Sequence, residues 1–140
     1  MSTPDENVAK LRHAYKQWHD TRGGSVQTWL DLMADDVRMR SLPDGAGGME
    51  FTRANAGKAA AAGYFAGLAA DWEMIHFNAD EFIAQGDRVV VLSVVAFRHR
   101  KTGKVAESPK ADVVRFRDGK IVEFFEFFDT AAALAATKPD

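Results

Sequence analysis

The dipeptide Asp118-Gly119 lies between two segments rich in β-branched and aromatic residues, which end at Phe116 and resume at Ile121. Asp-Gly favours a two-residue hairpin, because both central residues of that turn must adopt a positive φ. Two further turn-forming clusters interrupt the preceding sequence, so the pattern extends to an antiparallel meander. We expect its strands at Trp72 to Ala84, Arg88 to Arg100, Lys104 to Arg117 and Lys120 to Phe128.

The first half of the chain has helical periodicity instead. Thr3-Pro4-Asp5-Glu6 is a helix start, since it combines a capping hydroxyl, a proline at the first helical position and a Glu three residues after the cap. An apolar stripe follows at Val8, Leu11, Tyr15 and Trp18. We expect a second helix after Ser25, a loop over Leu42 to Gly48, a third helix over about Asn55 to Leu68, and a short terminal helix capped by Asp129.

Composition narrows the possible functions. The chain of 140 residues has no cysteine, so disulfides, thiolate nucleophiles and Cys-ligated zinc are excluded. Its 18 basic and 20 acidic residues leave no positive excess for binding nucleic acid or an anionic membrane. The N-terminal residues have no signal-peptide pattern, and we expect a single cytoplasmic domain over residues 1–140.

Strand alternation indicates where polar chemistry lies. Asp112 shares a strand face with Val114 and Phe116, and an isolated carboxylate among apolar side chains must be protonated, paired or hydrogen-bonded. A structural alternative is that Asp112 pairs with Lys110. On the last strand, Phe124, Glu126 and Phe128 share one face. The opposite face carries Phe125 and Phe127, and a solvated pair of phenylalanines favours a subunit interface.

Three helices followed by a long curved meander resemble the NTF2-like superfamily, and in particular its SnoaL-like and ketosteroid-isomerase-like branch. The matching residues are the segment Leu32 to Val37, Gly57 leading into Tyr64-Phe65, and the hairpin from Asp112 to Val122. The resemblance implies an α+β fold in which the three helices pack in a strongly curved antiparallel sheet, a cone also described as a cystatin-like roll. It also implies an apolar cavity and a tendency to dimerise.

The functional residues of the ketosteroid isomerases can be compared with this sequence one at a time. Asp112 resembles the neutral aspartic acid that donates a hydrogen bond to a steroid oxyanion. Tyr15 resembles the tyrosine that shares this oxyanion. The general-base aspartate falls on Ser41, which cannot accept a proton from carbon as a carboxylate does, so steroid isomerisation is disfavoured. Glu126 lies on the face that lines the pocket under the same alignment.

The expected site therefore has an acid–base part and a binding part. The candidate catalytic residues are Asp112, Glu126 and Tyr15, although each also has a structural explanation as a core or hydrogen-bonding residue. His76 is included as a ligand contact, although a structural role is the commoner one for such a histidine. No His and carboxylate spacing indicates a metal. The residues expected to bind ligand are Trp18, Ser41, Tyr64, His76, Val114, Phe116, Phe124 and Phe128.

Two functions remain from different classes. The first is a cofactor-independent enzyme of the SnoaL-like kind, an isomerase, cyclase or dehydratase that binds an apolar, carbonyl-bearing ligand in the cone. The second is a noncatalytic dimeric module that binds a metabolite or partner and whose two carboxylates are structural. Phe125 and Phe127 motivate the expected homodimer.

Overall fold

The computed structural model describes residues 2–140, which open with two helices. Helix α1 spans Pro4–Asp20 and begins with the expected capping box, in which Thr3 and Glu6 exchange side-chain and backbone hydrogen bonds. Helix α2 spans Val26–Leu32. The Ser25 hydroxyl does not cap α2, because its ψ of 44° departs from the extended conformation that a capping residue adopts.

A short strand and a third helix follow. Strand β1, Met33–Ser41, leads into the expected loop, which contains two 3-10 turns, Ala46–Gly48 and Glu50–Thr52. Strand β2 is Asn55–Ala56, and helix α3 spans Lys58–Asp71. The helix starts three residues later than predicted, because Asn55 and Ala56 pair with β1 and Gly57 has a φ of 98°.

The C-terminal half confirms the predicted meander to within one residue at each end. Strands β3, β4, β5 and β6 span Trp72–Gln85, Arg88–His99, Val105–Arg117 and Lys120–Phe128. Asp118 and Gly119 both have a positive φ, as the Asp-Gly turn requires. Helix α4, Thr130–Thr137, follows β6 as a fourth helix beyond the three N-terminal ones, and Asp129 caps it by accepting a hydrogen bond from the amide of Ala132.

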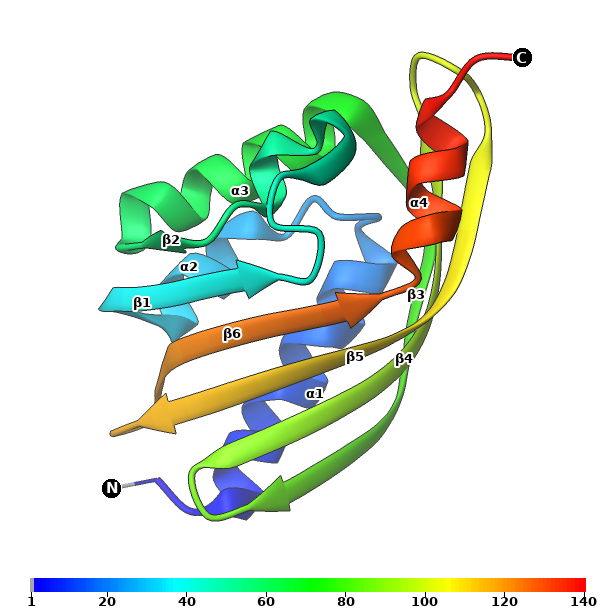
Figure 1. Ribbon diagram of the computed structural model, residues 1–140. Helices are drawn as coiled ribbons and strands as arrows, with labels where there is room; N and C mark the ends of the chain where they lie inside the picture. Colours follow the sequence, from blue (N-terminus) through cyan, green and yellow to red (C-terminus); the bar gives the residue numbers. More distant parts are fainter. Residues whose placement is uncertain (1) are drawn as a thin grey trace.

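The six strands form one curved sheet in the order β2-β1-β6-β5-β4-β3 (Figure 1). Every neighbouring pair is antiparallel except β1 and β6, which are parallel. The expected antiparallel sheet is therefore mixed at this one pair. The reason is that β1 reaches β6 through a long connection that includes α3 and four strands, and such crossovers join parallel neighbours.

The sheet curves around α1, which lies along one of its faces (Figure 1). Leu11, Ala14, Tyr15 and Trp18 of α1 pack there against the inward side chains of the strands. A second, smaller apolar cluster joins α4 to the loop after β1 through Ala133, Ala136, Met49 and Trp72. No helix within residues 2–140 is long and apolar enough to cross a membrane.

Candidate functional site

A pocket with a volume of about 90 Å³ lies between the concave face of the sheet and the helices. Its wall is largely aromatic. Helices α1, α2 and α3 and the strands all contribute, among others through Tyr15, Trp18, Trp29, Tyr64, Phe77 and Phe124. Such a wall excludes water and favours apolar ligands.

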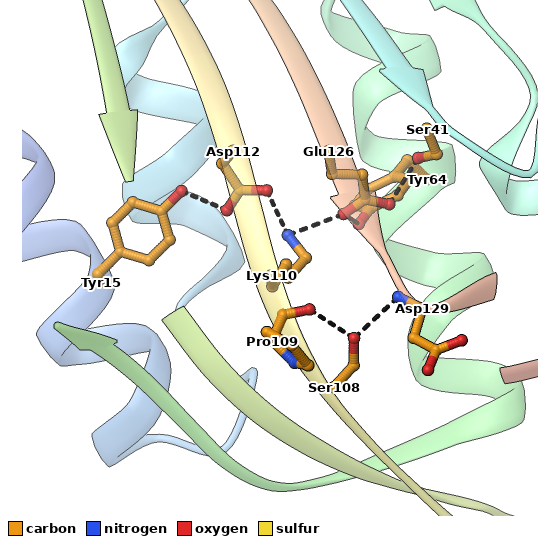
Figure 2. A network of polar contacts seen from close by, with 9 residues as sticks. All are labelled: Tyr15, Ser41, Tyr64, Ser108, Pro109, Lys110, Asp112, Glu126 and Asp129. Atoms are coloured by element: carbon orange, nitrogen blue, oxygen red, sulfur yellow. Dashed lines mark hydrogen bonds and ion pairs between the residues drawn. The ribbon is translucent and has the colours of Figure 1, made fainter. Parts of the chain in front are cut away.

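A charged cluster interrupts this apolar wall (Figure 2). Asp112 of β5 and Glu126 of β6 are direct partners across the strand pair, and both point inward. Lys110 lies two residues before Asp112 on the same strand face. Its ammonium group contacts Asp112 Oδ1 and lies 3.1 Å from Glu126 Oε2. One cation thus bridges two carboxyl groups.

Three hydroxyl groups complete the cluster from other elements. The Tyr15 hydroxyl of α1 donates to Asp112 Oδ2 at 2.6 Å, and the Tyr64 hydroxyl of α3 donates to Glu126 Oε2 at 2.7 Å. Ser41, at the end of β1, donates to Glu126 Oε1 at 2.5 Å. Every oxygen of the two carboxyl groups therefore accepts a hydrogen bond from the protein.

Burial and charge pairing shift the pKa values of Asp112 and Lys110. The side chains of Lys110, Asp112 and Glu126 are only 8%, 1% and 4% exposed. Burial raises the pKa of Asp112 above its ordinary value, and the Glu126 carboxylate adds to the rise, while Lys110 and Tyr15 oppose it. Burial alone would lower the pKa of Lys110, but attraction to Asp112 and Glu126 raises it. Lys110 is therefore a permanent cation near neutral pH.

The two tyrosines remain neutral donors. Burial and the neighbouring carboxyl groups raise the pKa of both Tyr15 and Tyr64 well above 10. Each phenol therefore keeps its proton and directs it at a carboxyl oxygen. Formally, one positive charge faces two carboxyl groups, so the cluster has a charge of −1 when both carboxyl groups are ionised.

A separate polar contact fixes the end of the pocket near α4 (Figure 2). The Ser108 hydroxyl donates to the backbone oxygen of Pro109 at 2.5 Å and accepts from the amide of Asp129 at 2.8 Å. Ser108 and Asp129 both line the pocket. The start of α4 is therefore tied to the strand that carries Lys110.

Most of the residues predicted from the sequence meet at this pocket. Its lining includes all three candidate catalytic residues and four of the expected ligand contacts: Tyr15, Asp112, Glu126, Trp18, Tyr64, Phe124 and Phe128. Ser41 touches Glu126 without lining the pocket. Their chemical roles stay predictions.

Besides Ser41, three expected ligand contacts do not line the pocket. Val114 and Phe116 point inward as predicted, but they are buried in the core. His76 is half-buried and pairs with Asn78 at 3.2 Å. A register shift between Met74 and His76 breaks the alternation on which the prediction for His76 relied, and Phe77 takes the inward position instead.

Two pocket residues received only structural interpretations from the sequence. The sequence indicates Lys110 only as a structural partner of Asp112, although the alternation that turns Asp112 inward also turns Lys110 inward. The helical spacing of the second helix indicates Trp29 only as a core-filling residue. It lines the pocket, and its indole nitrogen is buried without a hydrogen-bond partner among the described residues.

Comparison with known proteins agrees with this architecture. The sequence profile of the SnoaL-like domain matches residues 11–124. Comparison with curated proteins gave no match. An NTF2-like protein of unknown function from Burkholderia pseudomallei superposes with a TM-score of 0.82 at 28% sequence identity, covering 97% of this chain and 98% of its own.

Two further solved structures are similar. TerC, co-crystallised with polyporic acid, has a TM-score of 0.77 at 25% identity, covering 94% of this chain and 97% of its own. A protein from Catenulispora acidiphila with a ketosteroid isomerase-like fold has a TM-score of 0.72 at 18% identity. The superposition covers 99% of this chain and 96% of that protein. The last likeness concerns the fold alone.

Proposed function

The chain belongs to the SnoaL-like domain family, and from this premise we propose that its pocket binds a small, largely apolar molecule with a carbonyl group and moves a proton on it. The reaction uses side chains of the protein without a cofactor. Isomerisation, cyclisation and dehydration all share this step, because each begins with loss of a proton from carbon next to a carbonyl or hydroxyl-bearing centre.

The observation that carries the proposal is the Lys110 ammonium group between two buried carboxyl groups, inside an aromatic pocket. A buried cation next to a ligand oxygen stabilises the negative charge that develops when an adjacent carbon loses a proton. In an apolar pocket this stabilisation is larger than in water, since the local dielectric response is weaker.

The two carboxyl groups have different roles in this proposal. Asp112 is the proton donor in this proposal, a role that the rise of its pKa on burial supports. Glu126 is the proton acceptor. Ser41 aligns with the general-base aspartate of the isomerases, and its hydroxyl donates to Glu126. Glu126 therefore supplies, one strand away, the carboxylate that is missing at position 41.

The first test uses 2-tetralone, a neutral fused-ring ketone with acidic hydrogens next to its carbonyl. In heavy water, wild-type protein is expected to exchange these hydrogens for deuterium faster than buffer alone, as followed by proton NMR. Asp112→Asn and Glu126→Gln are each expected to reduce the protein-dependent rate at least 100-fold, the lower end of typical contributions from acid–base catalysis.

The matched control is Asp36→Asn, which removes an exposed carboxylate paired with Arg117 on the other side of the sheet. It is expected to exchange at the wild-type rate. Thermal unfolding of all variants shows whether each is folded. Equal exchange by folded wild-type and Asp112→Asn proteins would refute the assigned role of Asp112.

One observation favours a second function, a noncatalytic binding module. All four carboxyl oxygens of Asp112 and Glu126 already accept hydrogen bonds within the protein, which is the pattern of a structural polar network. Saturable binding of 2-tetralone by wild-type protein, with no exchange above the buffer rate, would support this module and reject the enzyme.

We further propose that two copies of the chain associate through the outer face of the sheet. Strand register there aligns Val90, Val113 and Phe125 in one row and Leu92, Ala111 and Phe127 in the next. The rings of Phe125 and Phe127 stack with centroids 4.2 Å apart. The two rows form a continuous apolar band of the kind that marks protein interfaces.

A further inference from the structure

The segment between β1 and β2, residues 43–53, is a compact loop, which we call the flap (Figure 1). Its two ends leave the sheet side by side, because Met39 of β1 and Asn55 of β2 are register partners. Surface loops with closely spaced ends are often functional. A loop of this shape can also turn about its two ends while the strands that carry it stay in place.

The hydrogen bonds of the flap are internal. In the described part of the chain, residues 43–53 form hydrogen bonds and ion pairs only within the range 41–54. The buried Thr52 hydroxyl, for example, accepts from the amide of Gly45 at 2.8 Å and donates to the backbone oxygen of Met49 at 2.6 Å. The flap can therefore move as a unit without breaking a hydrogen bond to the sheet or to a helix.

Apolar contacts hold the flap against the rest of the protein. Met49 packs with Trp72 of β3 and Ala133 of α4. The ring centroids of Phe51 and Tyr64 are 5.8 Å apart. Met49 and Phe51 also line the pocket, so the flap is part of the pocket wall. Segments held by few apolar contacts open at a smaller free-energy cost than the core does.

A close contact joins the flap to α4. Gly47 has a φ of 66°, and a Cβ at this position would overlap Leu134 Cδ2. Glycine is therefore the residue that allows the leucine side chain to lie directly against the flap backbone. Leu134 belongs to the same small apolar cluster as Met49. The contact between Gly47 and Leu134 thus fixes the flap in its closed position.

Helix α4 is anchored by hydrogen bonds near both ends, unlike the flap. Near its start, the Asp129 amide donates to the Ser108 hydroxyl at 2.8 Å. Near its end, the Thr102 hydroxyl donates to the backbone oxygen of Ala136 at 2.6 Å. Moving α4 would break both bonds. The flap is therefore the part of this wall that can open with the smaller loss of hydrogen bonds.

We propose that the flap is a gate, which moves away from α4 to admit a small molecule to the pocket and then closes against Leu134. When it is closed, Met49 and Phe51 complete the wall that keeps water from the charged cluster, and exclusion of water strengthens the interactions inside such a site. The gate requires only the pocket. It depends neither on the proposed reaction nor on the identity of the ligand.

Because the chain has no cysteine, the gate can be tested without a ligand. Val95→Cys and Val91→Cys each place a single thiol at a buried position of β4. Val95 lines the pocket, whereas Val91 is a core residue that does not line it. The rate at which iodoacetamide alkylates each thiol is measured by mass spectrometry, and thermal unfolding shows whether each variant is folded.

We expect the thiol of Val95→Cys to react roughly tenfold faster than that of Val91→Cys, or more, because local opening is more frequent than global unfolding. Its rate should stay constant in urea concentrations below the unfolding transition, since opening the flap exposes little surface. The rate for Val91→Cys should rise with urea over the same range, because global unfolding exposes much more surface.

Two further substitutions, each combined with Val95→Cys, identify the part that moves. Leu134→Ala removes the contact with Gly47 and should accelerate alkylation roughly tenfold, because the closed position loses apolar contacts that the open one lacks. The control, Thr102→Val, removes a hydrogen bond that anchors α4 and should leave the rate unchanged.

Equal rates and equal urea dependence for Val95→Cys and Val91→Cys would overturn the gate, because the pocket would then open only by global unfolding. Alkylation of Val95→Cys as fast as a thiol in an unfolded peptide would also overturn it, since the pocket would be permanently open. Faster alkylation with Thr102→Val would assign the movement to α4 and reject the flap. An unchanged rate with Leu134→Ala would reject the role of Leu134 in closure.

Discussion

At the scale of single residues, the prediction of which side chains face the pocket rests on strand alternation. Inward and outward side chains alternate as predicted wherever the strands are regular. Asp112 and Glu126 point into the pocket as the period of two requires. The same rule placed His76 inward, but the register shift after Met74 reverses the parity there. A bulge of this kind leaves no clear signature in a single sequence, so the inward position of Phe77 could not be predicted.

The hydrogen bonds of the site were beyond sequence reasoning for a different reason. Tyr15 and Asp112 are 97 positions apart, and Tyr64 and Glu126 are 62 apart. Which donor meets which carboxyl group depends on how α1 and α3 lie against the sheet. Periodicity indicates that a side chain is buried, but not which residue of another element it meets.

The raised pKa of Asp112 predicts how stability depends on pH. The folded state favours the protonated acid, so its contribution is fully present below the ordinary value of 3.8 and is lost as the pH rises through the folded-state pKa. Relative to Asp112→Asn, wild-type protein is expected to lose at most about 1.4 kcal/mol of unfolding free energy per pH unit over that interval. Urea denaturation of both proteins between pH 4 and pH 8 measures the difference.

Asp36→Asn provides a control of opposite sign. Hydrogen bonding to Arg117 lowers the pKa of Asp36, so this carboxylate contributes stability above its unfolded pKa and loses it as the pH falls. The stability of wild-type protein relative to Asp36→Asn should therefore rise with pH only below the ordinary value of 3.8 and stay constant between pH 4 and pH 8 apart from the tail of this titration. If the stability of wild-type protein relative to Asp112→Asn rose between pH 4 and pH 8, the assigned protonation of Asp112 would be wrong.

At the scale of elements, helix signals and turn chemistry predicted most of the fold. Thr3, Asp118 and Gly119 behave as their local chemistry requires, because capping and tight turns depend on neighbouring residues alone. The parallel pairing of β1 with β6 depends on the path of the chain through α3 and four intervening strands. No local pattern encodes such a crossover, so the sequence indicated only an antiparallel sheet.

Two glycines of α3 make a matched test of how this helix packs. A Cβ at Gly63 would meet nothing within 4 Å, whereas one at Gly67 would lie 2.5 Å from Phe51 Cβ. Gly63→Ala is expected to raise the unfolding free energy by up to about 1 kcal/mol, because alanine favours helix more than glycine does. Gly67→Ala should lower it, since Phe51 must move. Urea denaturation compares the two.

Phe51 also lines the pocket, so the two variants should differ in ligand binding. Gly67→Ala is expected to change the affinity for 2-tetralone, and Gly63→Ala is expected to leave it at the wild-type value. A stabilised Gly67→Ala protein would show that α3 does not pack against the loop after β1 as described.

At the scale of the whole molecule, the proposed homodimer is the main open prediction. Light scattering at micromolar concentration is expected to give twice the chain mass of 15.4 kDa. Phe125→Glu places a charge in the apolar band of the outer sheet face and should yield folded monomers, because an unpaired charge is costly to bury in an interface.

The control for this substitution is Ala66→Glu, which places the same charge at an exposed position of helix α3, away from the apolar band. It is expected to remain dimeric. A monomeric wild-type protein at the same concentration would contradict the proposal, and Phe125 would then be a surface residue whose ring is partly covered by Arg40.

Ser41, Glu126 and Asp112 are register partners across three adjacent strands, so backbone hydrogen bonds fix the spacing of this polar row. The aromatic lining combines side chains from the strands with others that three helices contribute. Exchanging lining residues would therefore reshape the chamber while the reactive groups keep their places. A scaffold divided in this way can acquire new ligands through a few substitutions without rebuilding its chemistry.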